Sequence, residues 1–140
     1  MSLDFSVFDS KTPANEGAWL HVKLPNGEPA YLDSTAKAPK KPVRIKLAGL
    51  MSDINRKWMQ ENARNNRNED EMSIDAIDLQ DAQLMAHLTL AWENIVVNGD
   101  PVECNEKNAI ELYFKFDQIR RQAFQFYVNS ENFTHGSVKS

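Results

Sequence analysis

The side chains best suited to chemistry lie between positions 69 and 81, where six carboxylates occur in thirteen residues without a lysine or arginine. On a helix, Glu71, Asp75 and Asp78 share one face. Paired carboxylates act as acid and base only in a pocket that shifts one pKa, and a charged run is commonly a solvated helix face. If these carboxylates have a function, they form a docking surface for a basic partner, or for the basic region 37–46 of a neighbouring copy. We therefore predict Asp75 and Asp78 as partner-binding residues, and a small hydrolase using the 69–81 carboxylates stays an alternative.

The other reactive side chains do not form a recognisable site. His21, His87 and His135 are far apart, and none has a cysteine or carboxylate at the spacing of metal ligands. Cys104 precedes a predicted helix start at Asn105, which can lower a thiol pKa, but no histidine partner follows at a known spacing. The five glycines are isolated, so no phosphate-binding loop is present. We predict no catalytic residue, no metal and no cofactor.

Composition excludes several classes of protein. The 140 residues fit one domain, and 41% hydrophobic with 26% charged residues is typical of a globular protein. The net charge of −4 argues against a general nucleic-acid binder. No apolar stretch approaches the roughly 20 residues of a membrane helix, and the N-terminus does not resemble a signal peptide. One cysteine suits a reducing cytosol.

Proline and charge divide the chain. Five of the six prolines lie at or before position 42. Residues 1–60 hold nine basic and six acidic side chains, whereas residues 61–140 hold seven and fourteen. Because proline breaks helices, we predict an α+β fold with an N-terminal β-hairpin and third strand, followed by a mostly helical part. The single domain 1–140 comprises a loosely held arm (1–17), a β-rich part (18–48), a helical part (50–133) and a disordered tail (134–140).

Period-two alternation predicts the strands. Residues 19–24 alternate, the turn 25–28 contains Asn26 and Gly27, and residues 30–33 return as the second strand. After a basic loop at 34–42, residues 43–47 alternate strictly and predict the third strand, with Val43, Ile45 and Leu47 on one side.

Helix caps and apolar spacing predict the helices. Ser52 caps a helix that frays into a mobile loop between 62 and 70, and Ser73 caps a second helix running to about residue 92. The apolar stripe that predicts this second helix comprises Ile74, Ile77, Leu84, Met85, Leu88, Ala91, Trp92 and Ile95.

The last third of the chain contains a short hairpin and two helices. The turn 98–101 pinches the hairpin. Asn105 caps a helix that brings Ile110, Tyr113 and Phe114 together, and Asp117 caps the last helix. The shared face of that helix comprises Ile119, Ala123, Phe126 and Tyr127.

Four apolar side chains lack an evident core role and are candidate partner contacts. Trp58 and Met59 lie on a helix with a thin apolar stripe, although packing against the hairpin is an equal alternative. Phe124 falls off the face of the last helix, and Phe133 follows that helix. We assign to the core the residues Leu88, Trp92, Ile95 and Tyr127.

Short segments spread from about Phe8 to Phe133 form a recognisable set. The N-terminal segments are Ala-Asn-Glu-Gly-Ala-Trp at 14–19, Pro-Asn-Gly at 25–27 and Val-Arg-Ile-Lys-Leu-Ala-Gly at 43–49. The C-terminal segments are Ala-Trp-Glu-Asn-Ile at 91–95, Asn-Gly-Asp-Pro-Val at 98–102, Asn-Glu-Lys-Asn-Ala-Ile at 105–110 and Ser-Glu-Asn-Phe at 130–133. Together these segments resemble the tail assembly chaperones of long flexible-tailed, siphovirus-type bacteriophages.

The resemblance implies a non-enzymatic role. Such chaperones bind the tape measure protein, keep it soluble, promote polymerisation of the tail-tube protein around it, and leave before the tail is complete. This chain would be the short form, made without the frameshift that appends a second domain. It would act in the host bacterial cytoplasm and be absent from the mature virion, with no nucleic-acid or membrane partner.

Two further expectations concern assembly. The opposite charges of the two halves could support head-to-tail self-association into higher oligomers. The alternative function is a structural tail-completion or minor tail component of the virion.

Overall fold

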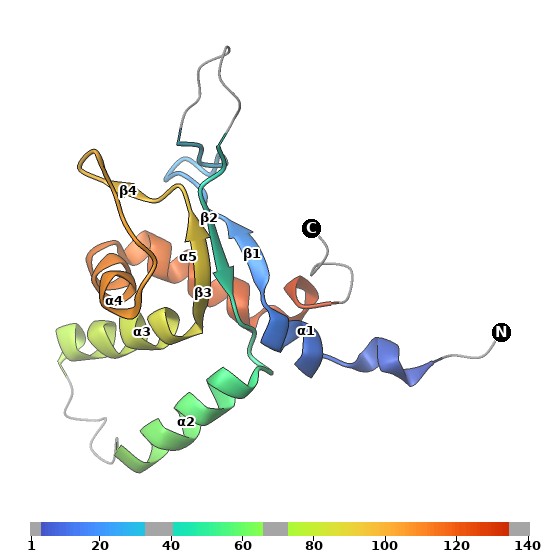
Figure 1. Ribbon diagram of the computed structural model, residues 1–140. Coiled ribbons are helices and arrows are strands. Elements are labelled where there is room, and N and C mark those ends of the chain that lie inside the picture. Colours follow the sequence, from blue (N-terminus) through green and yellow to red (C-terminus); the bar gives the residue numbers. More distant parts are fainter. Residues whose placement is uncertain (1–3, 33–40, 66–72, 135–140) are drawn as a thin grey trace.

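A computed structural model describes residues 4–32, 41–65 and 73–134. Its centre is an antiparallel sheet of three strands in the order β1-β2-β3, formed by β1 (Ala18–His21), β2 (Arg44–Leu47) and β3 (Thr89–Glu93) (Figure 1). Along β2 the burial alternates, and Ile45 and Leu47 are completely buried. The alternation predicted for residues 43–47 is therefore confirmed, together with the α+β fold class.

The prediction that residues 30–33 form a second strand is wrong, because β1 pairs directly with β2 and residues 29–32 form no strand. The chain between Val22 and Leu32 still turns back as a hairpin. Its turn is closed by hydrogen bonds from Leu24 N to Glu28 O and from Gly27 N to Leu24 O, and Gly27 has φ +89°. Residues 29–32 make only isolated bridges, from Pro29 to Lys23 and from Tyr31 to Pro42. Position 33 of the predicted second strand lies outside the described residues.

The prediction that the second long helix runs to residue 92 is wrong. Helix α3 (Ile74–Leu88) ends where Thr89 becomes extended, and Thr89 Oγ1 donates to the carbonyl of Met85. The next residues form β3 and pair with β2, with Trp92 opposite Ile45. By pairing with the open edge of β2, the backbone N–H and C=O groups of β3 find the hydrogen-bond partners that a longer helix would have supplied within itself.

The other helices begin close to their predicted caps. Ser52 Oγ accepts from Asn55 N at α2 (Asp53–Asn65), Ser73 caps α3, and Asn105 caps α4 (Glu106–Lys115). Helix α2 continues through residues 62–65, where fraying was expected, and residues 66–72 are not described.

Two details of the C-terminal helices differ from prediction. Helix α5 (Asp117–Val128) has Phe116 at its N-cap, with no side-chain cap bond, so Asp117 is its first residue. Phe114 is 44% exposed, whereas Tyr113 is fully buried, because the covered face of α4 continues through Ala109 and Leu112. The predicted short hairpin forms as β4 (Val96–Val97) paired with β5 (Asp100–Pro101). Its turn is shorter than predicted, because Asp100 and Pro101 belong to the strand and Asn98 and Gly99 make the turn.

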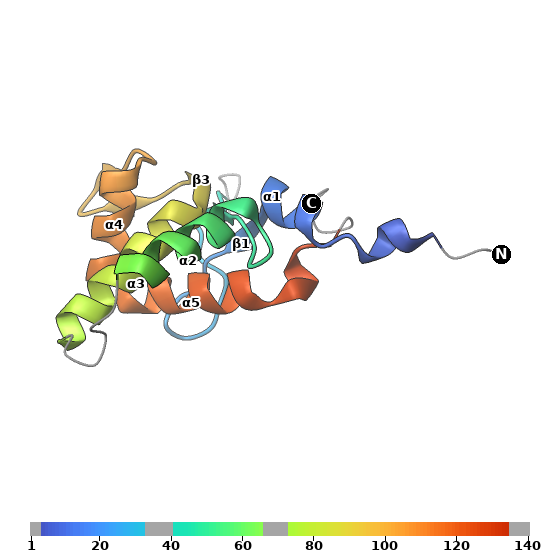
Figure 2. The same cartoon turned by 90° about the horizontal axis from the view of Figure 1, so that it is seen from below.

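The N-terminal arm is shorter than predicted. Helix α1 (Lys11–Glu16) buries Pro13 and Ala14, and Ala14 O accepts from Gly49 N. Only the 3-10 helix η1 (Phe5–Phe8) extends away from the body (Figures 1 and 2). At the other end, the 3-10 helix η3 (Ser130–Asn132) precedes Phe133, and most of the predicted tail, residues 135–140, lies outside the described residues.

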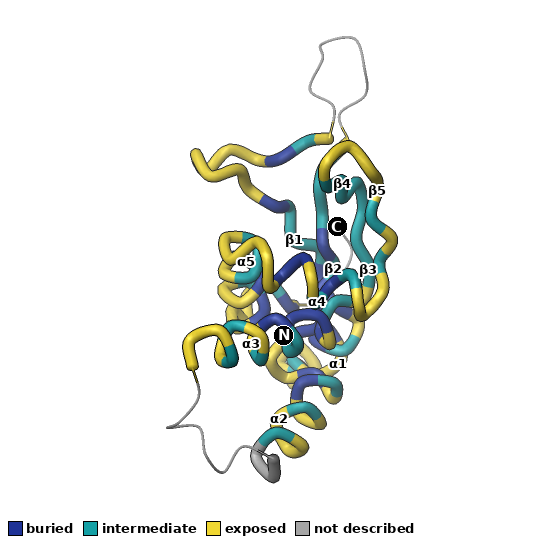
Figure 3. The backbone as a smooth tube through the Cα atoms, turned by 90° about the vertical axis from the view of Figure 1, so that its left-hand side faces the viewer, coloured by how far each residue is buried: buried dark blue, intermediate teal, exposed yellow. Residues whose placement is uncertain are grey.

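The core lies between the sheet and helices α3, α4 and α5 (Figure 3). Leu88 and Tyr127 are buried in it as predicted, and Trp92 and Ile95 pack against it while partly buried. The face predicted for the last helix is confirmed, but Ile74 and Ile77 are exposed because the first turns of α3 pass beyond the core. Within the described ranges, every helix is too short or too polar to cross a membrane.

Candidate functional site

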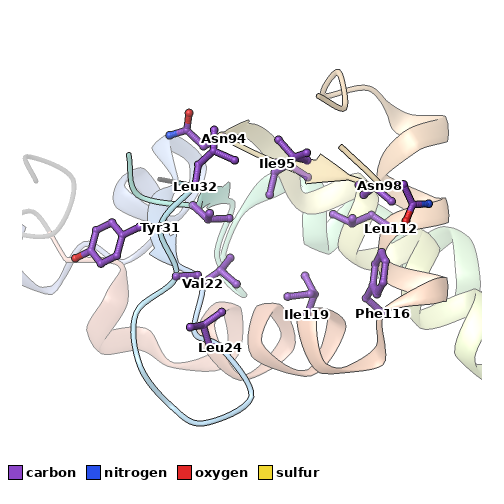
Figure 4. Close-up of a pocket in the computed structure, with 14 residues that line it drawn as sticks. Val22, Leu24, Tyr31, Leu32, Asn94, Ile95, Asn98, Leu112, Phe116 and Ile119 are labelled. Atoms are coloured by element: carbon purple, nitrogen blue, oxygen red, sulfur yellow. The ribbon is translucent and has the colours of Figure 1, made fainter. Parts of the chain in front are cut away.

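The described part of the molecule contains an apolar groove of about 400 Å³. One wall is the N-terminal hairpin, the opposite wall is the junction of α4 and α5, and the segment leading into β4 closes the top of the view in Figure 4. Val22, Leu112 and Ile119 point toward one another across the groove. Leu24, Leu32 and Phe116 line it while 45%, 43% and 36% exposed, so its apolar surface is open to a partner.

Backbone bonds and one side chain hold the hairpin wall. Ala30 N donates to Val22 O over 2.8 Å, and Val43 N donates to Ala30 O over 3.0 Å. His21 Nε2 lies 2.8 Å from the carbonyl oxygen of Ala30, and its ring meets the Tyr31 ring edge-on at 5.0 Å. The hairpin therefore presents its apolar side chains from a braced backbone.

Two asparagines shape the wall next to β4. Asn94 and Asn98 have φ of +62° and +52°, a left-handed conformation that asparagine tolerates better than most residues. Asn94 Nδ2 donates to Pro42 O over 2.9 Å, which ties this corner to the start of β2. Trp92 Nε1 donates to Val102 O over 2.8 Å and holds the β4–β5 hairpin against β3.

The lining of the groove suits apolar side chains and not charged substrates. None of the described residues that line it carries a charge, and its polar side chains are Tyr31, Asn94 and Asn98. Burial of apolar surface contributes about 25 cal/mol per Å². Binding is therefore favourable when a partner's apolar side chains cover the half-exposed leucine and phenylalanine side chains of the groove.

The titratable side chains outside the groove include Cys104 and Asp81. Burial raises the pKa of the Cys104 thiol, which disfavours the thiolate. Burial also raises the pKa of Asp81, which lies beside Arg120 and Asp78. Across residues 4–32, 41–65 and 73–134, no three His, Cys, Asp or Glu side chains are placed to hold a metal ion.

Of the two partner contacts predicted on α2, Trp58 packs against another helix and Met59 is exposed. The Trp58 ring lies 5.0 Å from the His87 ring, so this tryptophan joins α2 to the end of α3. Met59 is 58% exposed. Trp58 packs on α3, which differs from the alternative of packing against the hairpin.

The predicted acidic face separates into two environments. Asp75 is exposed near the start of α3, whereas Asp78 pairs with Arg120 of α5 at 3.3 Å. Glu71 lies outside the described residues. Asp78 therefore joins two helices of this chain, and Asp75 is the more accessible carboxylate.

The two predicted phenylalanines have opposite placements. Phe124 is 46% exposed on α5, and its ring meets the Tyr127 ring edge-on at 5.4 Å. Phe133 is only 4% exposed, and its ring packs against Phe126 at 5.6 Å. Its prediction as a contact residue is corrected, because the chain after α5 folds back over the core.

Sequence reasoning missed the groove. Trp58, Met59, Phe124, Phe133, Asp75 and Asp78 are all outside its lining. The sequence signal that could have indicated the groove is an apolar side chain beside a turn, as at Leu24 after the first strand and at Phe116 between two helices. Nothing local to either segment indicates that they face each other.

Comparisons with protein-family models, with curated proteins and with solved structures find no match to this chain.

Proposed function

We propose that this protein is a non-enzymatic tail assembly chaperone of a siphovirus-type bacteriophage. In this role it binds the tape measure protein, keeps it soluble and promotes polymerisation of the tail-tube protein around it. It acts in the host cytoplasm and leaves before the virion is complete. The observation that carries the proposal is the open apolar groove between the hairpin and the α4–α5 junction, together with the segment resemblance.

The groove offers a physical route to holding an aggregation-prone partner. A long amphipathic helix presents apolar side chains at intervals of three and four residues, and a groove can cover part of that stripe. Leu24 and Phe116 stand on opposite walls and are partly exposed, so a partner side chain between them would contact both. Such contacts are weak singly, and several copies along one long partner would multiply them.

The test is co-expression of the chain with the tape measure gene that neighbours its own gene. We expect the wild-type chain to keep the tape measure soluble and to co-purify with it. The groove variant is Leu24→Ser with Phe116→Ser, which removes apolar surface from both walls; serine is a favoured N-cap, so α5 should be retained. The matched control is Phe114→Ser, a 44% exposed residue of α4 that is outside the groove lining.

The outcomes separate the function from its site. If the wild-type chain leaves the tape measure insoluble and no complex forms, the proposed function is wrong. If the groove variant holds the tape measure as well as Phe114→Ser does, the function stands and the groove is not its site. Mass spectrometry of purified particles distinguishes the structural alternative, since a tail-completion or minor tail component would be present there.

A further inference from the structure

The 3-10 helix η1 exposes a cluster of apolar side chains. Phe5, Val7 and Phe8 are 75%, 61% and 66% exposed, and η1 extends away from the body in both views (Figures 1 and 2). The rings of Phe5 and Phe8 lie 5.7 Å apart and form one apolar tip. Two neighbouring exposed aromatic rings on a projecting segment are typical of a surface that another chain covers.

Local hydrogen bonds order both ends of this arm. Asp4 accepts from Ser6 N over 2.9 Å at the start of η1. Asp9 Oδ1 accepts from the backbone N–H groups of Lys11 and Thr12, each over 3.1 Å, and so joins the arm to the first turn of α1. An ordered arm loses less conformational entropy on binding than a flexible one.

A second apolar feature lies at the point where the arm leaves the body. A pocket of about 220 Å³ is lined by two serines, Ser10 and Ser130, and otherwise by Ala14, Leu50, Met51, Tyr127, Val128 and Phe133. Leu50, Met51 and Val128 are 40%, 45% and 37% exposed at its rim. Methionine adapts its shape to an incoming side chain, which suits a docking pocket. We call this the arm-base pocket.

We propose that two copies of this chain exchange their arms, so that Phe5 and Phe8 of each copy dock in the arm-base pocket of the other. Only Asp9 separates η1 from Ser10 at the pocket, yet η1 does not line its own pocket. A twofold axis placed between η1 and the pocket would lay each arm on the pocket of the other copy. Because arm and pocket belong to the same surface patch, the contact is self-complementary and closes at two copies. This inference stands independently of the proposed function.

Sedimentation over a range of concentrations tests the dimer. We expect a wild-type dimer that dissociates on dilution, as small interfaces do. The variant Phe5→Ser with Phe8→Ser removes four buried rings per dimer and should raise the dissociation constant by more than about a hundredfold. The control is Ile74→Ser with Phe114→Ser, which removes two exposed apolar side chains away from the pocket and should leave the dimer unchanged.

Disulfide trapping tests the exchange itself. In a Cys104→Ser background, one preparation carries Phe8→Cys and a second carries Val128→Cys. After mixing and mild oxidation, peptide mapping should find a disulfide that joins residue 8 of one chain to residue 128 of the other. A wild-type chain that stays monomeric, a dimer that the arm variant leaves intact, or a mixed sample without a disulfide between residues 8 and 128 would overturn the proposal.

Discussion

Gln122 holds the backbone of Lys23 by two hydrogen bonds, although the residues are 99 positions apart. Lys23 N donates to Gln122 Oε1 over 2.8 Å, and Gln122 Nε2 donates to Lys23 O over 2.9 Å. The side-chain amide of Gln122 thus pairs with the backbone N–H and C=O of Lys23, as the backbone of a neighbouring strand would. Since Ile119 is on the same helix as Gln122, this contact also sets the spacing of two groove walls.

Replacing Gln122 by alanine should loosen the hairpin without unfolding the protein. Each lost hydrogen bond contributes about 1 kcal/mol, so local opening of the hairpin should become roughly tenfold to a hundredfold more frequent. Amide hydrogen exchange at Lys23 measures this directly. Gln125→Ala, at an exposed glutamine of the same helix, is the control, and equal exchange rates in the two variants would contradict the assigned contact.

Local sequence signals predicted the starts of elements better than their ends. Ser52, Ser73 and Asn105 cap helices because each side chain accepts a backbone N–H within its own turn, a signal that lies in consecutive residues. The end of α3 was missed because Ala91 and Trp92 continue its helical spacing. Their strand conformation depends on the edge of β2, whose residues lie more than 40 positions earlier.

The candidate site was less predictable than the fold for the same physical reason. Exposure of Phe124 followed from its position off the apolar face of α5, and burial of Phe133 required knowing that the chain turns back after Asn129. The groove joins Leu24 to Phe116, which no periodicity relates. The properties of one helix or turn can be predicted from residues that are adjacent in the sequence. A surface built by segments far apart in the sequence cannot be predicted in this way.

Arg44 should stabilise the sheet through two neighbouring strands. Its guanidinium lies 4.6 Å from the centre of the Trp19 ring, and its Nε and Nη2 donate to Glu93 Oε2 over 3.0 and 2.6 Å. Because both charged groups are partly exposed, solvent screening limits the ion pair. We expect Arg44→Ala to lower the free energy of unfolding by about 1–2 kcal/mol, with only partial recovery in Arg44→Lys.

A double-mutant cycle with Glu93→Gln isolates the ion pair. Urea unfolding should give a coupling free energy of about 0.5–1 kcal/mol that falls in high salt. Lys46→Ala, on the same strand, should change stability by less than about 0.5 kcal/mol. A coupling energy of zero would show that Arg44 acts through Trp19 alone.

Phe133 and Phe124 should respond oppositely to truncation. Phe133→Ala leaves a cavity beside Phe126 and should lower the free energy of unfolding by about 3 kcal/mol. Phe124→Ala removes a largely exposed ring and should lower it by less than about 1 kcal/mol. Thermal or urea unfolding of the two variants measures the difference, and similar losses would mean that the segment after α5 does not close over the core.

Tyr113 should make the protein less stable at alkaline pH. The side chain is fully buried, and its hydroxyl donates to Thr89 Oγ1 at 2.7 Å, since that oxygen already donates to Met85 O. Burial raises the pKa of Tyr113 well above its ordinary value, because the phenolate would lose its hydration. The unfolded chain titrates near the ordinary tyrosine pKa of about 10, so above that pH only the unfolded state loses the proton. The stability present below pH of about 10 is therefore lost progressively as the pH rises further.

Urea unfolding at a series of pH values between about 8 and 11 measures this loss. Tyr113→Phe should be about 1 kcal/mol less stable at neutral pH, because one hydrogen bond is missing. Its stability should then decline less steeply than that of the wild-type chain above pH of about 10. Burial also raises the pKa of Tyr127, so part of the decline should persist in this variant and become smaller in the double variant with Tyr127→Phe. The raised pKa of the Cys104 thiol acts in the same direction and remains in both variants. Tyr31→Phe, at a half-buried tyrosine of the groove, is the control; if it flattened the decline as much as Tyr113→Phe, the burial of Tyr113 would not be the cause.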